Sequence, residues 1–225
     1  MSFKTEELKR LKETILKMAS LVEVAIRDSV KSLVEREAQL SDAVIKNDHV
    51  INTLDVQIDE ECIRLIARRQ PVARDLRFIT TGMKITTDLE RIADHAVNIA
   101  EKSRDLNDMP VTRAYNDISK MREVVQRMVK DAIDSFVNED RKLAKDVIIR
   151  DDEVDDLNAS IIDDLISTMI ENSASVIQST KLTYISRNLE RIADLAVNIS
   201  EMVIYMVEGR IIRHMANLNE LNGKL

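Results

Sequence analysis

Acidic side chains recur at helical spacing in two nearly identical segments of the chain. Residues 88–101 read DLERIADHAVNIAE and residues 188–201 read NLERIADLAVNISE, and eleven of the fourteen positions are identical. A helix turns by about 100° per residue, so Glu90, Asp94 and Glu101 fall within about 40° of one another on one face. Apolar residues occupy the other side. Carboxylates gathered in this way are suited to holding a hard cation.

A second acidic stripe precedes each of these segments. It consists of Asp48, Asn52, Asp55 and Asp59 in the first half, and of Asp151, Asp155 and Asn158 in the second half. The two stripes match at an offset of 103 positions, with Asn and Asp exchanged at the two inner positions. Each copy therefore keeps one amide and one carboxylate there.

An antiparallel hairpin would bring the two stripes of each copy together. Residues at one level of such a hairpin have position numbers with a constant sum, so turns near Pro71 and after Asn172 fix the pairing. The level pairs are Asp48 with Asp94, Asn52 with Glu90, Asp151 with Asp194, and Asp155 with Glu190. Two facing carboxylate pairs would form a cluster of oxygen ligands.

A solvated charged face is the alternative interpretation of any single stripe. With 40 acidic residues in 225, chance alone yields roughly seven acid-x-x-x-acid spacings, so one occurrence carries no weight. Repetition favours a cation site, because like charges four residues apart cost about 0.2–0.5 kcal/mol and a bound cation offsets that repulsion. Oxygen ligands favour Mg, Ca, Mn or ferric iron. The predicted metal ligands are Asp48, Asn52, Glu90, Asp94, Asp151, Asp155, Glu190 and Asp194, with Asp55, Asn98, Glu101, Asn198 and Glu201 as further candidates.

The composition predicts that long helices position these residues. Three Gly and two Pro in 225 residues exclude an all-β fold, which needs turn residues every ~8–12 positions. No apolar run approaches the ~18 residues of a membrane span, and the charged start of the chain lacks a signal-peptide core. A net charge of −7 opposes binding to nucleic acid. We therefore expect a soluble, cytoplasmic, all-α protein without membrane insertion.

Hydrophobic periodicity predicts six helices arranged as a duplication. The first begins near Thr5, and the others span about Ala38–Arg68, Pro71–Leu106, Asn116–Asn138, Glu139–Asn172 and Ser173–Glu208, with a stop at Gly209. Asn107–Pro110 is the best linker. The chain thus divides into two tandem three-helix units, residues 1–106 and 111–210, and a C-terminal tail of residues 211–225, and the family resemblance given below implies a pseudo-twofold relation between the units.

An arginine cluster marks only one of the two predicted hairpins. It consists of Arg68, Arg69, Arg74 and Arg77. Cations at a helix end can simply complement the helix dipole, and Asp75 is close enough in sequence to pair with them. The other interpretation is a partner-binding patch, since the second copy has no arginine at the corresponding turn.

Two other reactive side chains have structural interpretations. His95 could suggest a phosphoacceptor, but Leu195 replaces it in the second copy, so a neighbour of the metal site or an exposed histidine is the better interpretation. Cys62, the single cysteine, is expected to be a small core residue. No E-x-x-H motif occurs, which argues against a ferritin-like di-iron oxidase.

The paired LERIAD(H/L)AVNI(A/S)E segments, together with LIARRQPVARDLR at 65–77 and VIYMVEGRIIRH at 203–214, resemble the PhoU family of phosphate-transport and phosphate-signalling regulators. The resemblance covers nearly the whole chain. It implies two three-helix bundles, no catalytic activity, a cytoplasmic location and a dimer. It also implies a negative regulator that contacts a sensor histidine kinase and the ATP-binding subunit of a phosphate ABC transporter.

The same resemblance implies metal binding, most often of iron or zinc, through paired E(D)-x-x-x-D motifs. These motifs correspond here to Glu90–Asp94, Glu190–Asp194 and Asp151–Asp155, while Asn52 departs from the acidic pattern beside Asp48. Two other functions stay open from the residues: a carboxylate-bridged metalloenzyme for hydrolysis or redox chemistry, and a purely structural helical scaffold.

Overall fold

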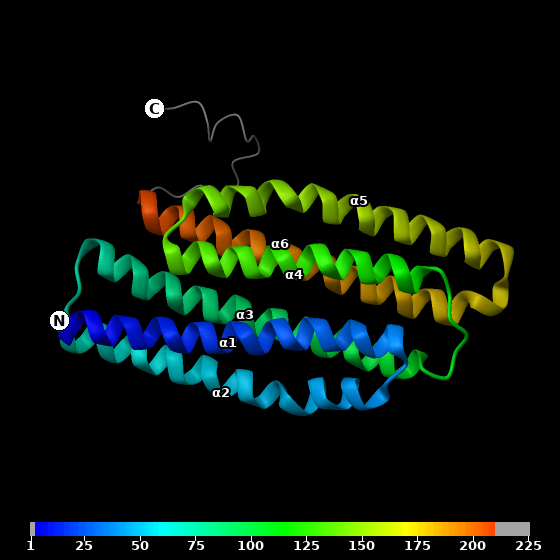
Figure 1. Ribbon diagram of the computed structural model, residues 1–225, viewed down its shortest axis with the longest axis horizontal. Helices are drawn as coiled ribbons and strands as arrows, with labels where there is room; N and C mark the ends of the chain where they lie inside the picture. Colours follow the sequence, from blue (N-terminus) through cyan, green and yellow to red (C-terminus); the bar gives the residue numbers. More distant parts are fainter. Residues whose placement is uncertain (1–2, 210–225) are drawn as a thin grey trace.

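The computed structural model describes residues 3–209, and within this range the chain consists of helices joined by turns and short loops (Figure 1). The helices are α1 (Phe3–Glu35), α2 (Ala38–Arg69), α3 (Ala73–Leu106), α4 (Ala114–Asn138), α5 (Arg141–Glu171) and α6 (Val176–Glu208), with a short 3-10 helix η1 (Ser173–Ser175) before α6. The predicted all-α fold with two tandem three-helix repeats is confirmed. The predicted tail, residues 211–225, lies outside the described residues.

Four helices form the centre of the molecule, and α2 and α5 lie on its flanks (Figure 1). Helices α1 and α6 each contact both α3 and α4, whereas within residues 3–209 α2 packs on α1 and α3 and α5 packs on α4 and α6. The two repeats therefore share one continuous hydrophobic core. The flanking helix of each repeat thus forms a long seam with a central helix. This seam lies between α2 and α3 in the first repeat and between α5 and α6 in the second.

The apolar residues that are identical in both copies of the motif lie in this core. The matched pairs Leu89 and Leu189, Ile92 and Ile192, Ala93 and Ala193, Ala96 and Ala196, and Ile99 and Ile199 are all buried. Gly82 has a packing role as well, because a Cβ there would lie 3.1 Å from Cδ1 of Ile15 on α1. Cys62 is fully buried, as expected, and burial raises the pKa of its thiol to about 12.

Two helices end at left-handed residues that are not glycine. Gln70 and Glu139 adopt this conformation at the ends of α2 and α4, with φ of 47° and 54°. The predicted end at Asn138 is confirmed, and α2 ends at Arg69 where Arg68 was predicted. At the predicted stop, Gly209 has a φ of 70°. Pro71 was expected in the first turn of the third helix, but α3 begins at Ala73 and Pro71 belongs to the turn.

Asp140 caps α5 directly after the left-handed Glu139. Its side chain accepts hydrogen bonds from the backbone N–H groups of Lys142 and Leu143, at 2.9 and 3.1 Å. We expect Asp140→Ala to lower the free energy of unfolding by about 1 kcal/mol, because two N–H groups of the first turn lose their acceptor. Urea denaturation measures the change, and Asp140→Asn, which keeps the acceptor, should recover most of it.

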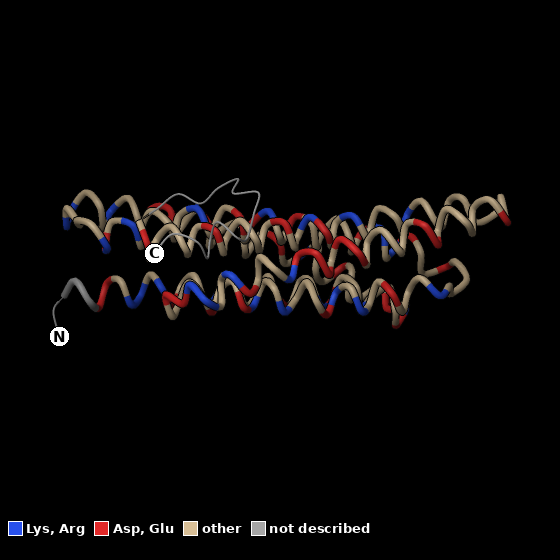
Figure 2. Tube along the Cα trace, turned by 90° about the horizontal axis from the view of Figure 1, so that it is seen from above, with Lys and Arg blue, Asp and Glu red and all other residues tan. Residues whose placement is uncertain are grey.

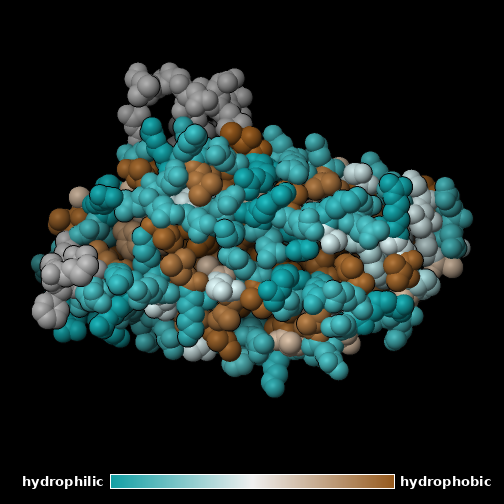
Figure 3. Space-filling view, in the orientation of Figure 1, coloured by the Kyte–Doolittle hydropathy of each residue, from teal (hydrophilic) through white to brown (hydrophobic). Residues whose placement is uncertain are grey.

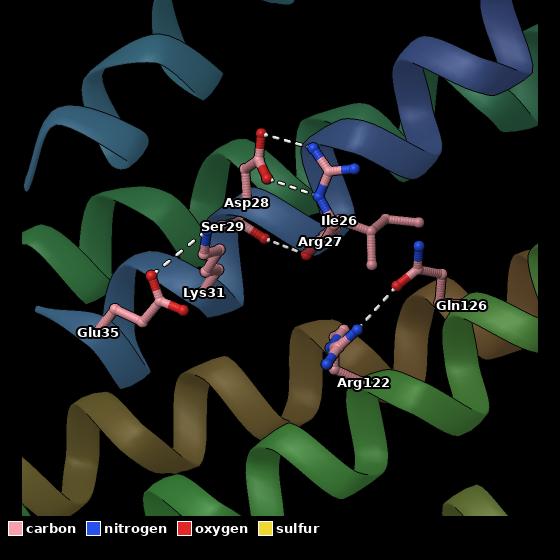
Figure 4. Close-up of polar contacts among 8 residues, drawn as sticks. All are labelled: Ile26, Arg27, Asp28, Ser29, Lys31, Glu35, Arg122 and Gln126. Atoms are coloured by element: carbon pink, nitrogen blue, oxygen red, sulfur yellow. Dashed lines mark hydrogen bonds and ion pairs between the residues drawn. The ribbon is translucent and has the colours of Figure 1, made fainter. Parts of the chain in front are cut away.

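The seam between α1 and α4 is not tied together by the ion pairs beside it. Figure 4 shows that Arg27 pairs with Asp28 and Lys31 with Glu35 along α1, and that Arg122 donates to Gln126 along α4. Each of these contacts lies within one helix. Exposed pairs of this kind contribute little to stability, and the repeats are joined by the shared apolar core together with contacts elsewhere, such as Arg74 with Glu139 and His95 with Asn188.

No helix among residues 3–209 is long and apolar enough to cross a membrane.

Candidate functional site

The second repeat gathers four carboxylates along the seam between α5 and α6. This group, cluster 2, consists of Asp151 and Asp155 on α5 and Glu190 and Asp194 on α6. Partial burial and the charges of the other three members raise the pKa of Asp151 to about 7. The pKa values of Glu190 and Asp194 are raised as well, first by desolvation and then by neighbouring carboxylates that include Asp155. The facing pairs predicted from the sequence are therefore close in space.

The first repeat forms an equivalent group along the seam between α2 and α3. This group, cluster 1, consists of Asp48 and Asp55 on α2 and Glu90 and Asp94 on α3. Desolvation raises the pKa values of Glu90 and Asp94, and the charge of Asp48 adds to both shifts. Asp55 also acts on Glu90. Cluster 1 thus has four carboxylates despite Asn52, because Asp55 supplies the charge that the asparagine lacks.

The asparagine of each acidic stripe, Asn52 or Asn158, forms a hydrogen bond with a neighbouring side chain. Asn52 donates from its amide to Asp48 at 2.9 Å. In the second repeat the amide is Asn158, whose oxygen accepts a hydrogen bond from the hydroxyl of Ser186 at 2.6 Å. Desolvation and the charge of Asp59 raise the pKa of its counterpart Asp55, and the neighbouring Thr86 offsets part of that rise. Each cluster therefore holds four carboxylates and one amide.

The carboxylates of the clusters are suitable ligands for a cation, but their side chains do not converge on a common point. One oxygen of Asp48 and one of Asp55 are buried without a hydrogen-bond partner. Such oxygens are costly unless a donor or a cation satisfies them. Within residues 3–209, however, no group of three or more His, Cys, Asp or Glu side chains is close enough together to hold an ion. Side chains of the clusters would have to rotate toward a bound metal.

Of the further candidate ligands, Asp55 belongs to cluster 1, where it acts on Glu90. Asn98 and Glu101 continue the stripe along α3, and Asn198 and Glu201 continue it along α6. These four stay predictions.

The arginine beside each cluster has a different partner in the two repeats. Arg191 approaches Asp194 of cluster 2, with Nη1 and Oδ2 3.3 Å apart. Its counterpart Arg91 instead pairs with Asp88, also at 3.3 Å. Position 188 carries asparagine where position 88 carries aspartate, so Arg191 lacks the acidic partner that Arg91 uses. This single difference directs Arg191 to a cluster carboxylate, whereas Arg91 pairs with Asp88 and acts on Glu90 of cluster 1 only through its charge.

His95 connects the two repeats rather than lying free. Its Nδ1 is 2.8 Å from Oδ1 of Asn188 on α6, and Asn188 is itself buried. The charge of His95 lowers the pKa values of Asp94 in cluster 1 and Asp194 in cluster 2. The prediction of an exposed or metal-neighbouring histidine missed this contact, because it depends on how α3 and α6 cross.

Three of the four predicted partner-binding arginines make contacts inside the chain. Arg69 forms a bidentate pair with Glu7, at 2.8 and 2.9 Å, Arg74 pairs with Glu139, and Arg77 donates to the backbone oxygen of Met206 at 3.0 Å. Arg68 lies beside the same Glu7, whose pKa it helps to lower. These arginines tie α2 and α3 to other helices, and they point in several directions. Arg68, Arg69 and Arg74 nevertheless stay exposed, so the partner-binding patch stays a prediction.

Comparison with known proteins identifies the family. The PhoU domain model matches residues 15–103 and 118–203, one match for each repeat. The chain is 41% identical over 209 residues to a "Phosphate-specific transport system accessory protein PhoU homolog" of Aquifex aeolicus. The matched region covers 93% of this chain and 95% of that protein. It is 37% identical to a relative of the same name from Clostridium acetobutylicum, over 91% of this chain and 94% of the relative.

Solved structures agree with this assignment. The crystal structure of PhoU from Pseudomonas aeruginosa has a TM-score of 0.88 at 36% identity, covering 92% of this chain and 99% of that one. The phosphate transport system regulatory protein PhoU from Streptococcus pneumoniae has a TM-score of 0.87 at 26% identity, covering 93% and 99%. With both repeats matched in sequence and the six-helix arrangement matched in space, the chain belongs to the PhoU family.

Proposed function

We propose that this protein is a negative regulator of phosphate uptake and of phosphate-starvation signalling, and that it acts through protein contacts. Its partners would be a sensor histidine kinase and the ATP-binding subunit of a phosphate ABC transporter. The observation that carries the proposal is family membership over both repeats, since the relatives are named accessory proteins of phosphate-specific transport systems. Such a name describes a regulator rather than an enzyme.

We further propose that each carboxylate cluster binds a metal cation, with iron as the first candidate and zinc or another divalent ion as the alternative. Cluster 1 would hold it with Asp48, Asp55, Glu90 and Asp94, and cluster 2 with Asp151, Asp155, Glu190 and Asp194. A bound cation supplies positive charge that cancels the carboxylate repulsion evident in the raised pKa values. It would thereby hold α2 against α3 and α5 against α6, and fix the surface that partners contact.

The protein would act in the cytoplasm as a homodimer, without binding nucleic acid and without inserting into the membrane. The net charge of −7 supports the exclusion of nucleic acid, because a polyanion is attracted by clustered basic groups.

Genetic and binding experiments test the proposed regulatory function. Removing the gene for this chain from its host is expected to switch on starvation genes and uptake at high phosphate, and re-expression should restore repression. The purified chain should bind the ATP-binding subunit and the cytoplasmic part of the kinase. Unchanged uptake and signalling after removal would refute the proposal.

The enzyme alternative makes a different prediction with the same material. A carboxylate-bridged metalloenzyme would hydrolyse phosphate esters or consume oxygen in the presence of metal. We expect neither activity above the rate of free metal in solution. A purely structural scaffold would keep full repression when cluster carboxylates are neutralised.

A further inference from the structure

A pocket of about 290 Å³ opens between α1, α2 and α3 of the first repeat. Its lining is mainly aliphatic, with Leu21, Val24 and Ala25 on α1, Val44 and Ile51 on α2, and Val97 on α3. Figure 3 shows hydrophobic atoms at the surface over the middle of α1 and α2, on a face that is mostly hydrophilic. A pocket of this size is suited to a small ligand with an apolar part.

The charge inside this pocket is acidic. Among the described residues that line it, the charged ones are Asp28 on α1 and Asp48 on α2, although Figure 2 shows basic and acidic residues interspersed along the layer of helices that begins at the N-terminus. One oxygen of Asp48 is buried without a hydrogen-bond partner. Asp28 pairs with the half-exposed Arg27 beside it (Figure 4), and such a pair contributes little, so Asp28 remains available to another cation. The pocket is therefore suited to a cation on an apolar stem.

The second repeat supplies such a cation from within the chain. Position 150 is the counterpart of position 47 at the offset of 103, and it carries arginine in place of Asn47, which lines the pocket. The counterpart of Asp28 is Asp131. Arg150 donates from Nη1 to Oδ2 of Asp131 at 2.7 Å, and each of these two side chains is only 25% exposed. The place that corresponds to the pocket thus accommodates a guanidinium group on an aliphatic stem.

The first repeat has smaller side chains at these positions and no internal cation there. Ala25, which lines the pocket, corresponds to Met128, whose larger side chain is fully buried. Asn47 is shorter than Arg150 and carries no charge. The space between α1 and α2 is therefore left open where Met128 and Arg150 occupy the space between α4 and α5. The pocket has the size and the charge to take from outside the group that Arg150 supplies from inside.

We propose that this pocket binds a small free ligand that carries a guanidinium group on an aliphatic stem. The guanidinium pairs with Asp28, as Arg150 pairs with Asp131 in the second repeat. The aliphatic stem lies against Val44 and Ile51, which line the pocket. The inference goes beyond the proposed function, because it uses neither the transporter nor the kinase nor a bound metal.

Titration of the purified chain with propylguanidinium, which is the arginine side chain without its backbone, tests the inference. A chelator is present because Asp48 also belongs to cluster 1, and NMR chemical shifts measure binding up to the millimolar range that suits so small a ligand. We expect saturable binding to the wild type and about tenfold weaker binding to Asn47→Arg, whose new guanidinium occupies the pocket and repels the probe. The control Gln57→Arg adds the same charge at an exposed position of α2 outside the pocket, and it should bind the probe like the wild type.

A second variant separates filling of the pocket from added charge. Ala25→Met introduces the larger side chain found at Met128 without changing the charge, and it should also weaken binding of propylguanidinium by about tenfold. Propylurea, which has nearly the same shape but no charge, should bind the wild type about tenfold more weakly than propylguanidinium does. Circular dichroism should show unchanged helix content in every variant.

Three results would overturn the inference. The absence of saturable binding to the wild type would mean that the pocket takes no such ligand. Equal binding of propylguanidinium to the wild type, Asn47→Arg and Ala25→Met would place the probe elsewhere on the acidic surface. Equal binding of propylurea and propylguanidinium would mean that the pocket recognises the apolar stem alone. The proposed regulatory function stands in each of these cases.

Discussion

Neutralising cluster 2 by Glu190→Gln/Asp194→Asn is expected to remove metal from the second repeat. Two of its four carboxylates lose their charge, while the seam keeps its shape because Gln and Asn match Glu and Asp in size. Bound metal measured by elemental analysis should fall by about half relative to the wild type. At a metal concentration one hundred times the Kd, the variant should also lose about 2.7 kcal/mol of metal-dependent stabilisation.

The control must change the same charge outside the cluster. Asp163→Asn/Asp164→Asn neutralises two carboxylates farther along α5, and this variant should bind metal and gain stability like the wild type. The corresponding variant of cluster 1, Glu90→Gln/Asp94→Asn, should lose the other half of the bound metal. A wild-type protein that neither retains metal nor shifts its melting temperature when metal is added would refute the proposed metal sites.

The metal-free protein is expected to be more stable at pH 5.5 than at pH 8. Asp151 has a pKa of about 7 in the folded chain, well above the ordinary range of an aspartate. The folded state therefore holds a proton that the unfolded state has already released, so stability falls as the pH rises from about 4 to about 7. Asp55, Glu90, Asp94, Glu190 and Asp194 are shifted in the same direction.

Asp151→Asn isolates the largest part of this effect. A shift of about three pKa units nominally corresponds to about 4 kcal/mol, and screening at this partly exposed position reduces it to roughly 2 kcal/mol. The variant should therefore be more stable than the wild type at pH 8 without metal, and nearly equal to it below pH 4. Urea denaturation across this range measures both, with Asp163→Asn as the control. Equal pH dependence in the variant and the wild type would show that Asp151 titrates normally.

Both expectations follow from the repulsion between carboxylates that the fold brings together in cluster 1 and in cluster 2. Packing draws four carboxylates of each repeat to one seam, and nothing among the described residues fully neutralises them. Arg191 compensates in part at cluster 2, at 3.3 Å from Asp194, whereas Arg91 is paired with Asp88 instead. We therefore expect cluster 1 to depend on an added cation at least as strongly as cluster 2.

The sequence alone determined the helices, the duplication and the levels at which carboxylates face each other. Those features depend on local periodicity and on the constant sum of positions in an antiparallel hairpin, and the charge of Asp48 raises the pKa of Asp94 across α2 and α3, after desolvation. The left-handed conformation of Gln70 and Glu139 was not predicted, because these residue types carry no signal for it, although the end of α4 at Asn138 was.

Only the tertiary structure decided which charges act together and which side chains stay exposed. Asp55 joins cluster 1, His95 contacts Asn188 across the repeats, and three of the four arginines pair with Glu7, Glu139 and the backbone of Met206 on other helices. These contacts depend on how α3 crosses α6 and on how the helix ends meet in space. Periodicity along one helix contains no information about that crossing, so the partners could be found only once the helices were packed.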